Sequence, residues 1–236
     1  MNSKIHSKFL MTFGLAIVAL LFQNFDFGRI ASTTLEPIDQ DARVLHAKEL
    51  LGKHYRGSLA QKAEAISDLQ VTIYNDIHKN LPKKYRAQAL TLTMTLIAEA
   101  QANDLDPVFV MAVIKTESSF NPKARGSHGE IGLMQLKPDT AQWIAEKEDL
   151  FWQGPKTLEN PVENVRIGIT YLALLREQSS GFANKYLSAY NLGLAKVRRM
   201  YKASKTPKEY SVRVMKNYKD IYKRMIASRT EVIAQN

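Results

Sequence analysis

Residues 106–117 constrain the fold most, because they predict an apolar helix that ends in a single acid, Glu117. An Asp-Pro pair opens the segment, and both residue types favour a helix start. Val110, Val113 and Ile114 stand seven, four and three residues before the acid, so the four side chains share one face. A helix of this kind belongs in a helical core, and it carries its acid with it.

The position of Glu117 predicts a carboxyl group that keeps its proton at neutral pH. Burial disfavours the charged form, and the negative end of the helix dipole repels it. Both effects raise the pKa, as a general acid requires. The alternative is a Glu in solvent, or one paired with Lys115 or Lys123. We predict that Glu117 is a catalytic acid.

Three further motifs follow the acid in a fixed order. The four together are ESSFNP at 117–122, GEIGLMQL at 129–136, NPVEN at 160–164, and AYNLG at 189–193. The Asn-Pro pair of the first motif predicts the end of the catalytic helix. Residues 123–130 contain two Gly, a Ser and a His, which is typical of a loop. Without further information, the second motif is better explained as a surface loop that places Leu133, Met134 and Leu136 in the core before a helix near Pro138.

In this order, the four motifs resemble those of the soluble-type lytic transglycosylases, a family within the goose-lysozyme-like superfamily. The resemblance covers residues 90–210. It implies a mainly α fold with a lysozyme-like helical domain, no metal and no cofactor, and a single catalytic Glu at Glu117. It also implies cleavage of the β-1,4 bond between N-acetylmuramic acid and N-acetylglucosamine in peptidoglycan, leaving 1,6-anhydromuramic ends.

The resemblance also implies a set of substrate-binding residues. A glycine lets backbone approach a ligand closely, and a glutamine side chain both donates and accepts hydrogen bonds. The hydroxyl of Tyr190 is expected to bond either the acid or the acetamido group of the substrate. The expected binding residues are Ser118, Gly132, Met134, Gln135, Tyr190 and Asn191.

Two positions depart from the family pattern. Gly126 stands where the family often has a serine, and Ser127 beside it is a candidate replacement that would bond the acid. Glu130 stands where many members have alanine, and we expect it to be a loop charge. If Glu130 instead points into the cleft, it could position water and make the enzyme a muramidase. His128 is assigned no role.

Other segments of the chain predict structure rather than chemistry. The Asn160-Pro161 pair predicts the start of a core helix, so Glu159 and Glu163 are not expected to be catalytic. Residues 90–96 alternate between apolar side chains and threonine, but their Ala- and Gln-rich flanks favour a helix.

The amino-terminal region predicts export. Basic residues precede an apolar run at 9–22, which suits a signal peptide or an N-terminal membrane anchor within residues 1–32. The chain has no Cys, so neither a lipoprotein anchor nor a disulfide is available. We expect a periplasmic protein, soluble after signal cleavage or anchored to the inner membrane. Residues 36–84 are predicted to be an N-terminal helical extension, and residues 85–228 the catalytic domain.

The formal net charge of +10 is concentrated near the C-terminus. Lys and Arg recur through residues 196–229, where Val212, Met215, Tyr218 and Tyr222 provide apolar spacing. We expect a solvated basic face on a helix that covers the core. Besides peptidoglycan glycan strands, an anionic membrane surface or envelope machinery remain open as partners. The export signal argues against nucleic acid. A chitin-cleaving enzyme and a non-catalytic glycan-binding component of a cell-envelope assembly are the alternative functions.

Overall fold

The computed structural model describes residues 35–234, and this part of the chain is helical with no β-strand. The predicted mainly α fold, with an additional helical segment before the catalytic region, is confirmed. The predicted leader at 1–32 lies outside the described residues. None of the described helices is both long enough and apolar enough to cross a membrane.

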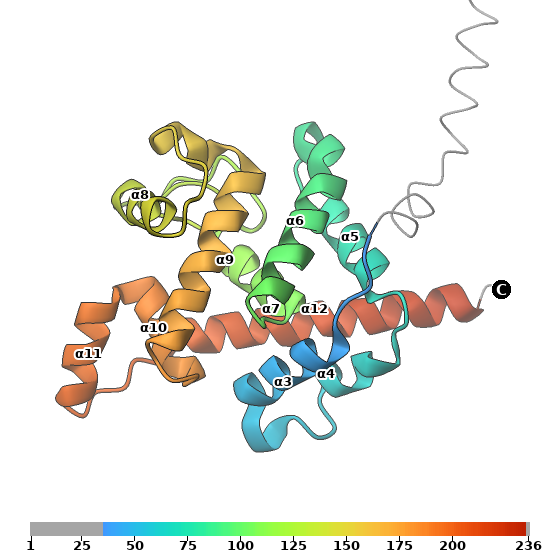
Figure 1. The fold of residues 1–236 in the computed structure, drawn as a ribbon. Coiled ribbons are helices and arrows are strands. Elements are labelled where there is room, and N and C mark those ends of the chain that lie inside the picture. The colour runs from blue at the N-terminus through green and yellow to red at the C-terminus, as the bar shows by residue number, and fades with distance from the viewer. Residues whose placement is uncertain (1–34, 235–236) are drawn as a thin grey trace, which may run out of the picture. The chain divides into compact units, whose positions relative to one another are not determined.

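The α-helices are α3 Gln40–Leu51, α4 Leu59–Lys62, α5 Leu69–Asn80, α6 Ala89–Ala102, α7 Pro107–Ser118, α8 Pro138–Lys147, α9 Pro161–Glu177, α10 Ala183–Leu192, α11 Leu194–Lys202 and α12 Glu209–Ala234 (Figure 1). Short 3-10 helices occupy Gly52–His54, Ala63–Ala65, Lys83–Gln88 and Pro155–Glu159.

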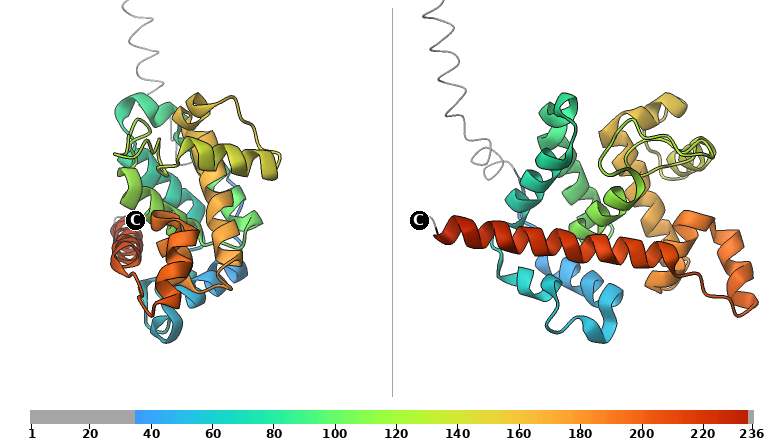
Figure 2. Two further views of the ribbon diagram at one scale, coloured as in Figure 1. Left: turned by 90° about the vertical axis from the view of Figure 1, so that its left-hand side faces the viewer. Right: turned by 180° about the vertical axis from the view of Figure 1, so that it is seen from behind.

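Helix α7 carries the predicted acid and packs against α6 and α12. Figure 2 shows α12 as a long helix that runs past α7. The Asp106 side chain accepts a hydrogen bond of 2.8 Å from the Val108 N–H, which confirms the predicted helix start. All residues from Pro107 to Ile114 are buried. The helix ends three residues before the Asn-Pro pair, because Ser119 and Phe120 turn into left-handed backbone with φ of 51° and 63°.

Helices α6 and α9 pack against each other, and both form where the sequence predicts a helix. Residues 90–96 lie within α6, so the strand-like alternation is overridden and the helix prediction is confirmed. The Asn160 side chain caps α9 by accepting a 2.9 Å bond from the Val162 N–H. Glu163 pairs with Arg166 one turn along instead of closing a capping box.

The amino-terminal helices pack against the rest of the described chain, a question that the sequence left open. Arg43 of α3 is fully buried and donates a 2.8 Å hydrogen bond to the Tyr222 hydroxyl of α12. Glu49 of α3 forms an ion pair with Arg176 of α9 at 2.8 Å. The domain boundary near residue 85 stays a prediction.

Helix α12 turns a narrower apolar face inward than predicted. Tyr218 and Tyr222 are buried, but Val212 is 63% exposed, so its assignment to the apolar spacing was wrong. The helical period explains the difference. Ser211, Val214 and Tyr218 share the buried face of α12, and Val212 lies one residue after Ser211, so it is rotated away from that face.

Candidate active site

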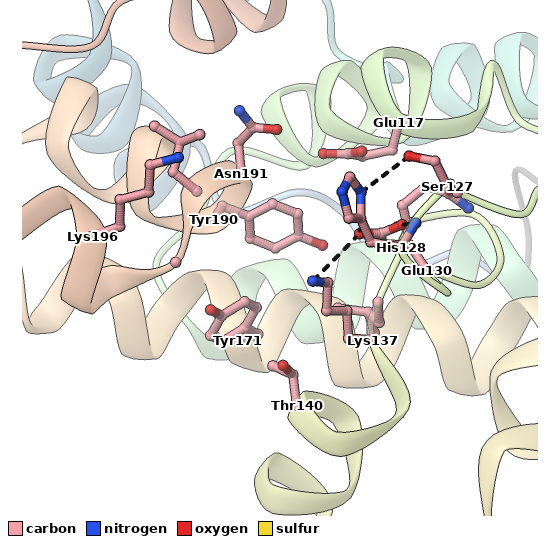
Figure 3. Close-up of a pocket in the computed structure, with 15 residues that line it drawn as sticks. Glu117, Ser127, His128, Glu130, Lys137, Thr140, Tyr171, Tyr190, Asn191 and Lys196 are labelled. Atoms are coloured by element: carbon pink, nitrogen blue, oxygen red, sulfur yellow. Dashed lines mark hydrogen bonds and ion pairs between the residues drawn. The ribbon is translucent and has the colours of Figure 1, made fainter.

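A cavity of about 520 Å³ opens beside the end of α7 (Figure 3). Its lining comes from α7, from the loop between α7 and α8, and from the helices α8 to α11. Polar and aromatic side chains dominate the lining, an environment in which sugars can be held by hydrogen bonds and ring contacts. The lining residues include Glu117, Gly126, Ser127, His128, Glu130, Gln135, Lys137, Thr140, Tyr171, Tyr190, Asn191 and Lys196.

Glu117 lies in the last turn of α7 and lines this cavity. Burial raises its pKa to about 7 from an ordinary value of 4.5, and the nearby charge of Glu130 acts in the same direction. A hydrogen bond from Tyr210 and the charge of Arg213 oppose this rise without reversing it. Lys123, a candidate for neutralising the acid, pairs with Glu159 instead. At neutral pH a substantial fraction of Glu117 therefore carries a proton, which a general acid needs.

Tyr210 holds the carboxyl of Glu117 in place. Its hydroxyl, at the start of α12, donates a hydrogen bond of 2.5 Å to Glu117 Oε1. The Tyr210 ring is held in turn by Arg213, whose guanidinium lies 5.7 Å from the ring centroid. Sequence reasoning did not single out Tyr210, which lies 93 residues beyond the acid.

Tyr190 lines the cavity but does not bond the acid. Its hydroxyl donates a 2.7 Å hydrogen bond to the backbone carbonyl of Met134. Its ring packs between Tyr171, with centroids 5.3 Å apart, and Tyr210, with centroids 6.4 Å apart. The sequence analysis expected the Tyr190 hydroxyl to bond either the acid or the substrate. In the structure Tyr210 bonds the acid instead, so for Tyr190 the contact with substrate stays a prediction.

The GEIGLMQL segment is anchored to α9 by Asn164. This buried side chain accepts a 2.8 Å bond from the Met134 N–H and donates to the carbonyls of Ile131 and Leu158. Gly132 has a φ of 83°, and a Cβ there would lie 2.3 Å from Asn164 Nδ2. This glycine thus allows the loop to approach α9.

Three of the six expected binding residues line the cavity: Gln135, Tyr190 and Asn191. The other three do not. Gly132 faces Asn164 as described, Ser118 bonds back to the Ile114 carbonyl at 3.2 Å, and Met134 is fully buried. The Met134 sulfur fills the space above Gly168 of α9, so this side chain contributes packing rather than a substrate contact.

The loop between α7 and α8 differs from the sequence expectation. Glu130 lines the cavity and is not merely a charge on the loop surface. Ser127 bonds the ring of His128 at 3.0 Å, so it does not replace the missing serine as a partner of the acid. Lys137 and Lys196 also line the cavity and were not singled out from the sequence. Nothing local marks them, because their neighbourhood depends on how the helices pack.

Glu159 and Glu163, which the sequence excluded from catalysis, do not line this cavity. Glu159 forms ion pairs with Lys123 and Arg125, and Glu163 with Arg166. Their environments are those of structural carboxylates.

A helical fold that places a carboxyl of raised pKa, Glu117, beside a polar cavity is an arrangement suited to general acid catalysis. The model of the family described as "Transglycosylase SLT domain" matches residues 94–212, which is half of the chain. The chain belongs to this family, which confirms the resemblance found in the motifs.

Individual relatives agree with this assignment over part of their length. The chain is 29% identical over 134 residues to a soluble lytic murein transglycosylase of Salmonella typhimurium, covering 55% of this chain and 20% of that protein. It is 37% identical over 106 residues to a membrane-bound lytic murein transglycosylase C of Histophilus somni, covering 41% of this chain and 29% of that protein. The chain thus spans less than a third of the length of these relatives.

Among solved structures, the 70 kDa soluble lytic transglycosylase of Escherichia coli is similar at 19% identity, with a TM-score of 0.47. The similarity covers 81% of this chain and 38% of that chain.

Proposed function

We propose that this protein is a peptidoglycan lytic transglycosylase. It cleaves the β-1,4 bond between N-acetylmuramic acid and N-acetylglucosamine and leaves 1,6-anhydromuramic ends. The observation that carries the proposal is the Glu117 carboxyl, which lines the cavity and whose pKa burial raises to about 7. Membership of the transglycosylase SLT domain family supports the choice of a murein glycan as substrate.

The proposed reaction uses Glu117 first as an acid and then as a base. The acid protonates the bridging oxygen while the acetamido oxygen of the muramic residue attacks C1, so the glycosidic bond breaks and an oxazolinium ring forms. The resulting Glu117 carboxylate takes the proton from the 6-hydroxyl of the same sugar. O6 then attacks C1 and the acetamido group is released, which closes the anhydro ring without consuming water.

The surrounding residues have distinct parts in this reaction. Tyr210 orients the acid through its 2.5 Å hydrogen bond and stabilises the carboxylate after proton transfer. Gln135 and Asn191 offer amide groups to the hydroxyl and acetamido groups of the glycan, and Tyr190 forms part of the cavity wall beside them. The site of action we propose is the periplasm, for a protein that is either released from its leader or anchored by it.

The test is digestion of purified peptidoglycan followed by mass analysis of the products. Anhydro ends are lighter than reducing ends by one water, so they identify a transglycosylase directly. We expect anhydro products from the wild type, and from Glu117→Gln glycan binding without cleavage. Predominantly reducing ends would mean a muramidase, and cleavage by neither protein would mean a glycan-binding module.

A further inference from the structure

We propose that Glu130 is a second functional carboxylate of the cavity, which stabilises the positive charge that develops on the muramic sugar during bond cleavage. The inference rests on the proposed function and extends it, because that mechanism assigns chemistry to one acid only. Its grounds are the position of Glu130, the groups that hold it, and the space that the loop provides for it.

Glu130 lines the same cavity as Glu117 but comes from a different element. Glu117 belongs to α7, and Glu130 to the loop that joins α7 to α8 (Figure 3). The Glu130 side chain is 21% exposed. The two carboxyls are close enough for the charge of Glu130 to act on Glu117.

The loop holds the Glu130 carboxylate in its ionised form. Its Oε2 atom accepts a 3.0 Å hydrogen bond from the backbone N–H of His128. Lys137 Nζ lies 3.8 Å and His128 Nδ1 3.9 Å from its Oε1 atom. Burial alone would raise the pKa of Glu130, but backbone N–H bonds and the charge of Lys137 outweigh burial and lower it. The ion pair with Lys137 is longer than a direct hydrogen bond, so the carboxylate keeps its charge available to the cavity.

The chain also leaves room for this carboxylate at Gly126. A Cβ at position 126 would lie 2.1 Å from Glu130 Oε2 and 3.0 Å from Gln135 Oε1. The backbone of Gly126 does not have positive φ, so its conformation does not require a glycine. The absence of a side chain at Gly126 therefore makes room for the Glu130 carboxylate, whereas the local backbone conformation would allow other residues.

The two carboxyls thus have opposite environments within one cavity. Burial raises the pKa of Glu117, so that a substantial fraction keeps its proton at neutral pH, while backbone N–H bonds and the charge of Lys137 lower the pKa of Glu130, which stays charged. Such a pair marks the acid and the charge-stabilising partner in glycan-cleaving sites. A fixed negative charge favours the cationic oxazolinium over the neutral substrate, so it accelerates the chemical step more than it improves binding.

The test compares Glu130→Gln with Glu159→Gln, a matched loss of one carboxylate whose ion pairs lie outside the cavity. For Glu130→Gln we expect kcat on soluble glycan strands to fall about tenfold or more, with KM changed less than about threefold. The control is expected to keep the wild-type kcat. Glu130→Asp is expected to recover part of the rate, because it restores the charge.

The pH profile separates a charge effect from a structural one. The other groups that face Glu117 are Tyr210 and Arg213 of α12 and Tyr190 of α10. They are the same in the wild type and in Glu130→Gln, so they do not contribute to the difference between the two pH profiles. Removing the negative charge of Glu130 lowers the pKa of Glu117, and the alkaline limb of kcat is expected to move to lower pH. Thermal unfolding is expected to be unchanged.

Three results would overturn the inference. The first is a Glu130→Gln rate within about twofold of the Glu159→Gln rate. The second is a rate loss that comes with a lower melting temperature and an unmoved alkaline limb. The third is an unchanged rate with a shift between reducing and anhydro products, which would mean that Glu130 positions water. A wild-type protein that cleaves nothing would refute the proposed function instead.

Discussion

Among single residues, Glu117 shows how the protonated carboxyl that the proposed reaction needs opposes stability. A carboxyl whose folded pKa is about 7 ionises at higher pH than the same group in the unfolded chain, near 4.5. Between these two values the unfolded state releases more protons, so stability falls as pH rises. Below about pH 4.5 both states are protonated and the penalty is absent.

We therefore predict that Glu117→Gln stabilises the protein at neutral and alkaline pH. An amide cannot ionise, so the variant avoids a penalty of about 2 kcal/mol, which corresponds to part of the shift after partial exposure is considered. Thermal unfolding of both proteins at pH 4 and pH 8 measures it. The variant should melt higher at pH 8 and nearly level with the wild type at pH 4. An equal difference at both pH values would contradict the raised pKa.

Tyr210 should control both the position and the pKa of the acid. The Tyr210 hydroxyl stabilises the ionised carboxyl, so Tyr210→Phe should raise the pKa of Glu117 further. The Glu117 side chain would also lose the hydrogen bond that holds its position. We expect kcat to fall about tenfold, with the alkaline limb of the pH profile moving to higher pH. Tyr85→Phe, outside the cavity, is the control. An alkaline limb that stays in place would mean that the hydroxyl does not act on Glu117.

The contrast between Glu117 and Tyr210 shows what the sequence could predict at this scale. The raised pKa of Glu117 was predicted from its place at the end of one apolar helix, because helical spacing is readable from the sequence. The contact with Tyr210 depends on where α12 lies, which local spacing does not determine. The same limit explains Met134, whose side chain was expected in the cavity and lies under α9.

Among the elements, α7 and α12 are joined by a buried cluster at the opposite end of α7 from the acid. Asp106 caps α7, and its Oδ2 atom accepts hydrogen bonds from Tyr218 at 2.5 Å and Tyr222 at 2.8 Å. Arg43 of α3 adds a positive charge beside this carboxylate through its bond to Tyr222. The capping residue of α7 thus belongs to a hydrogen-bonded cluster that includes side chains of α3 and α12. The sequence predicted the cap but not its partners.

We predict that Asp106→Asn lowers the free energy of unfolding by about 2–4 kcal/mol. The amide keeps one cap acceptor but presents an N–H₂ group to two hydroxyl donors, and it leaves the buried charge of Arg43 uncompensated. Denaturant unfolding measures the change. Asp139→Asn, an exposed acid in the first turn of α8, is the control and should change stability by less than about 1 kcal/mol. Equal losses of stability in both variants would mean that the bonds of Asp106 to Tyr218 and Tyr222 add nothing beyond an ordinary helix cap.

In the described chain as a whole, residues outside the family match support those inside it. The match covers residues 94–212, whereas α3 to α5 precede it and most of the cavity lining lies within it. The ion pair of Glu49 with Arg176 joins α3 to α9, the helix that also anchors the GEIGLMQL segment through Asn164. The sequence predicted a helical extension over residues 36–84, but it could not say which surface these helices cover.

Because these contacts are buried or partly buried, the amino-terminal helices and the matched region should unfold together. We predict a single calorimetric transition whose measured enthalpy equals the van't Hoff enthalpy. Glu49→Ala leaves Arg176 without its ion-pair partner, and should lower the melting temperature of that one transition by a few degrees, for a loss of about 1–2 kcal/mol.

The control for Glu49→Ala is Glu148→Ala, which removes a carboxylate that pairs with the neighbouring Lys147 and should change the free energy of unfolding by less than about 0.5 kcal/mol. If the extension were an independent unit, Glu49→Ala would split the transition and lower only its first part. Cleavage activity would then survive heating through that first part, because the cavity would still be intact. Loss of activity in step with a single transition requires instead that α3 contributes to the framework that holds α9, and with it the loop over Glu117.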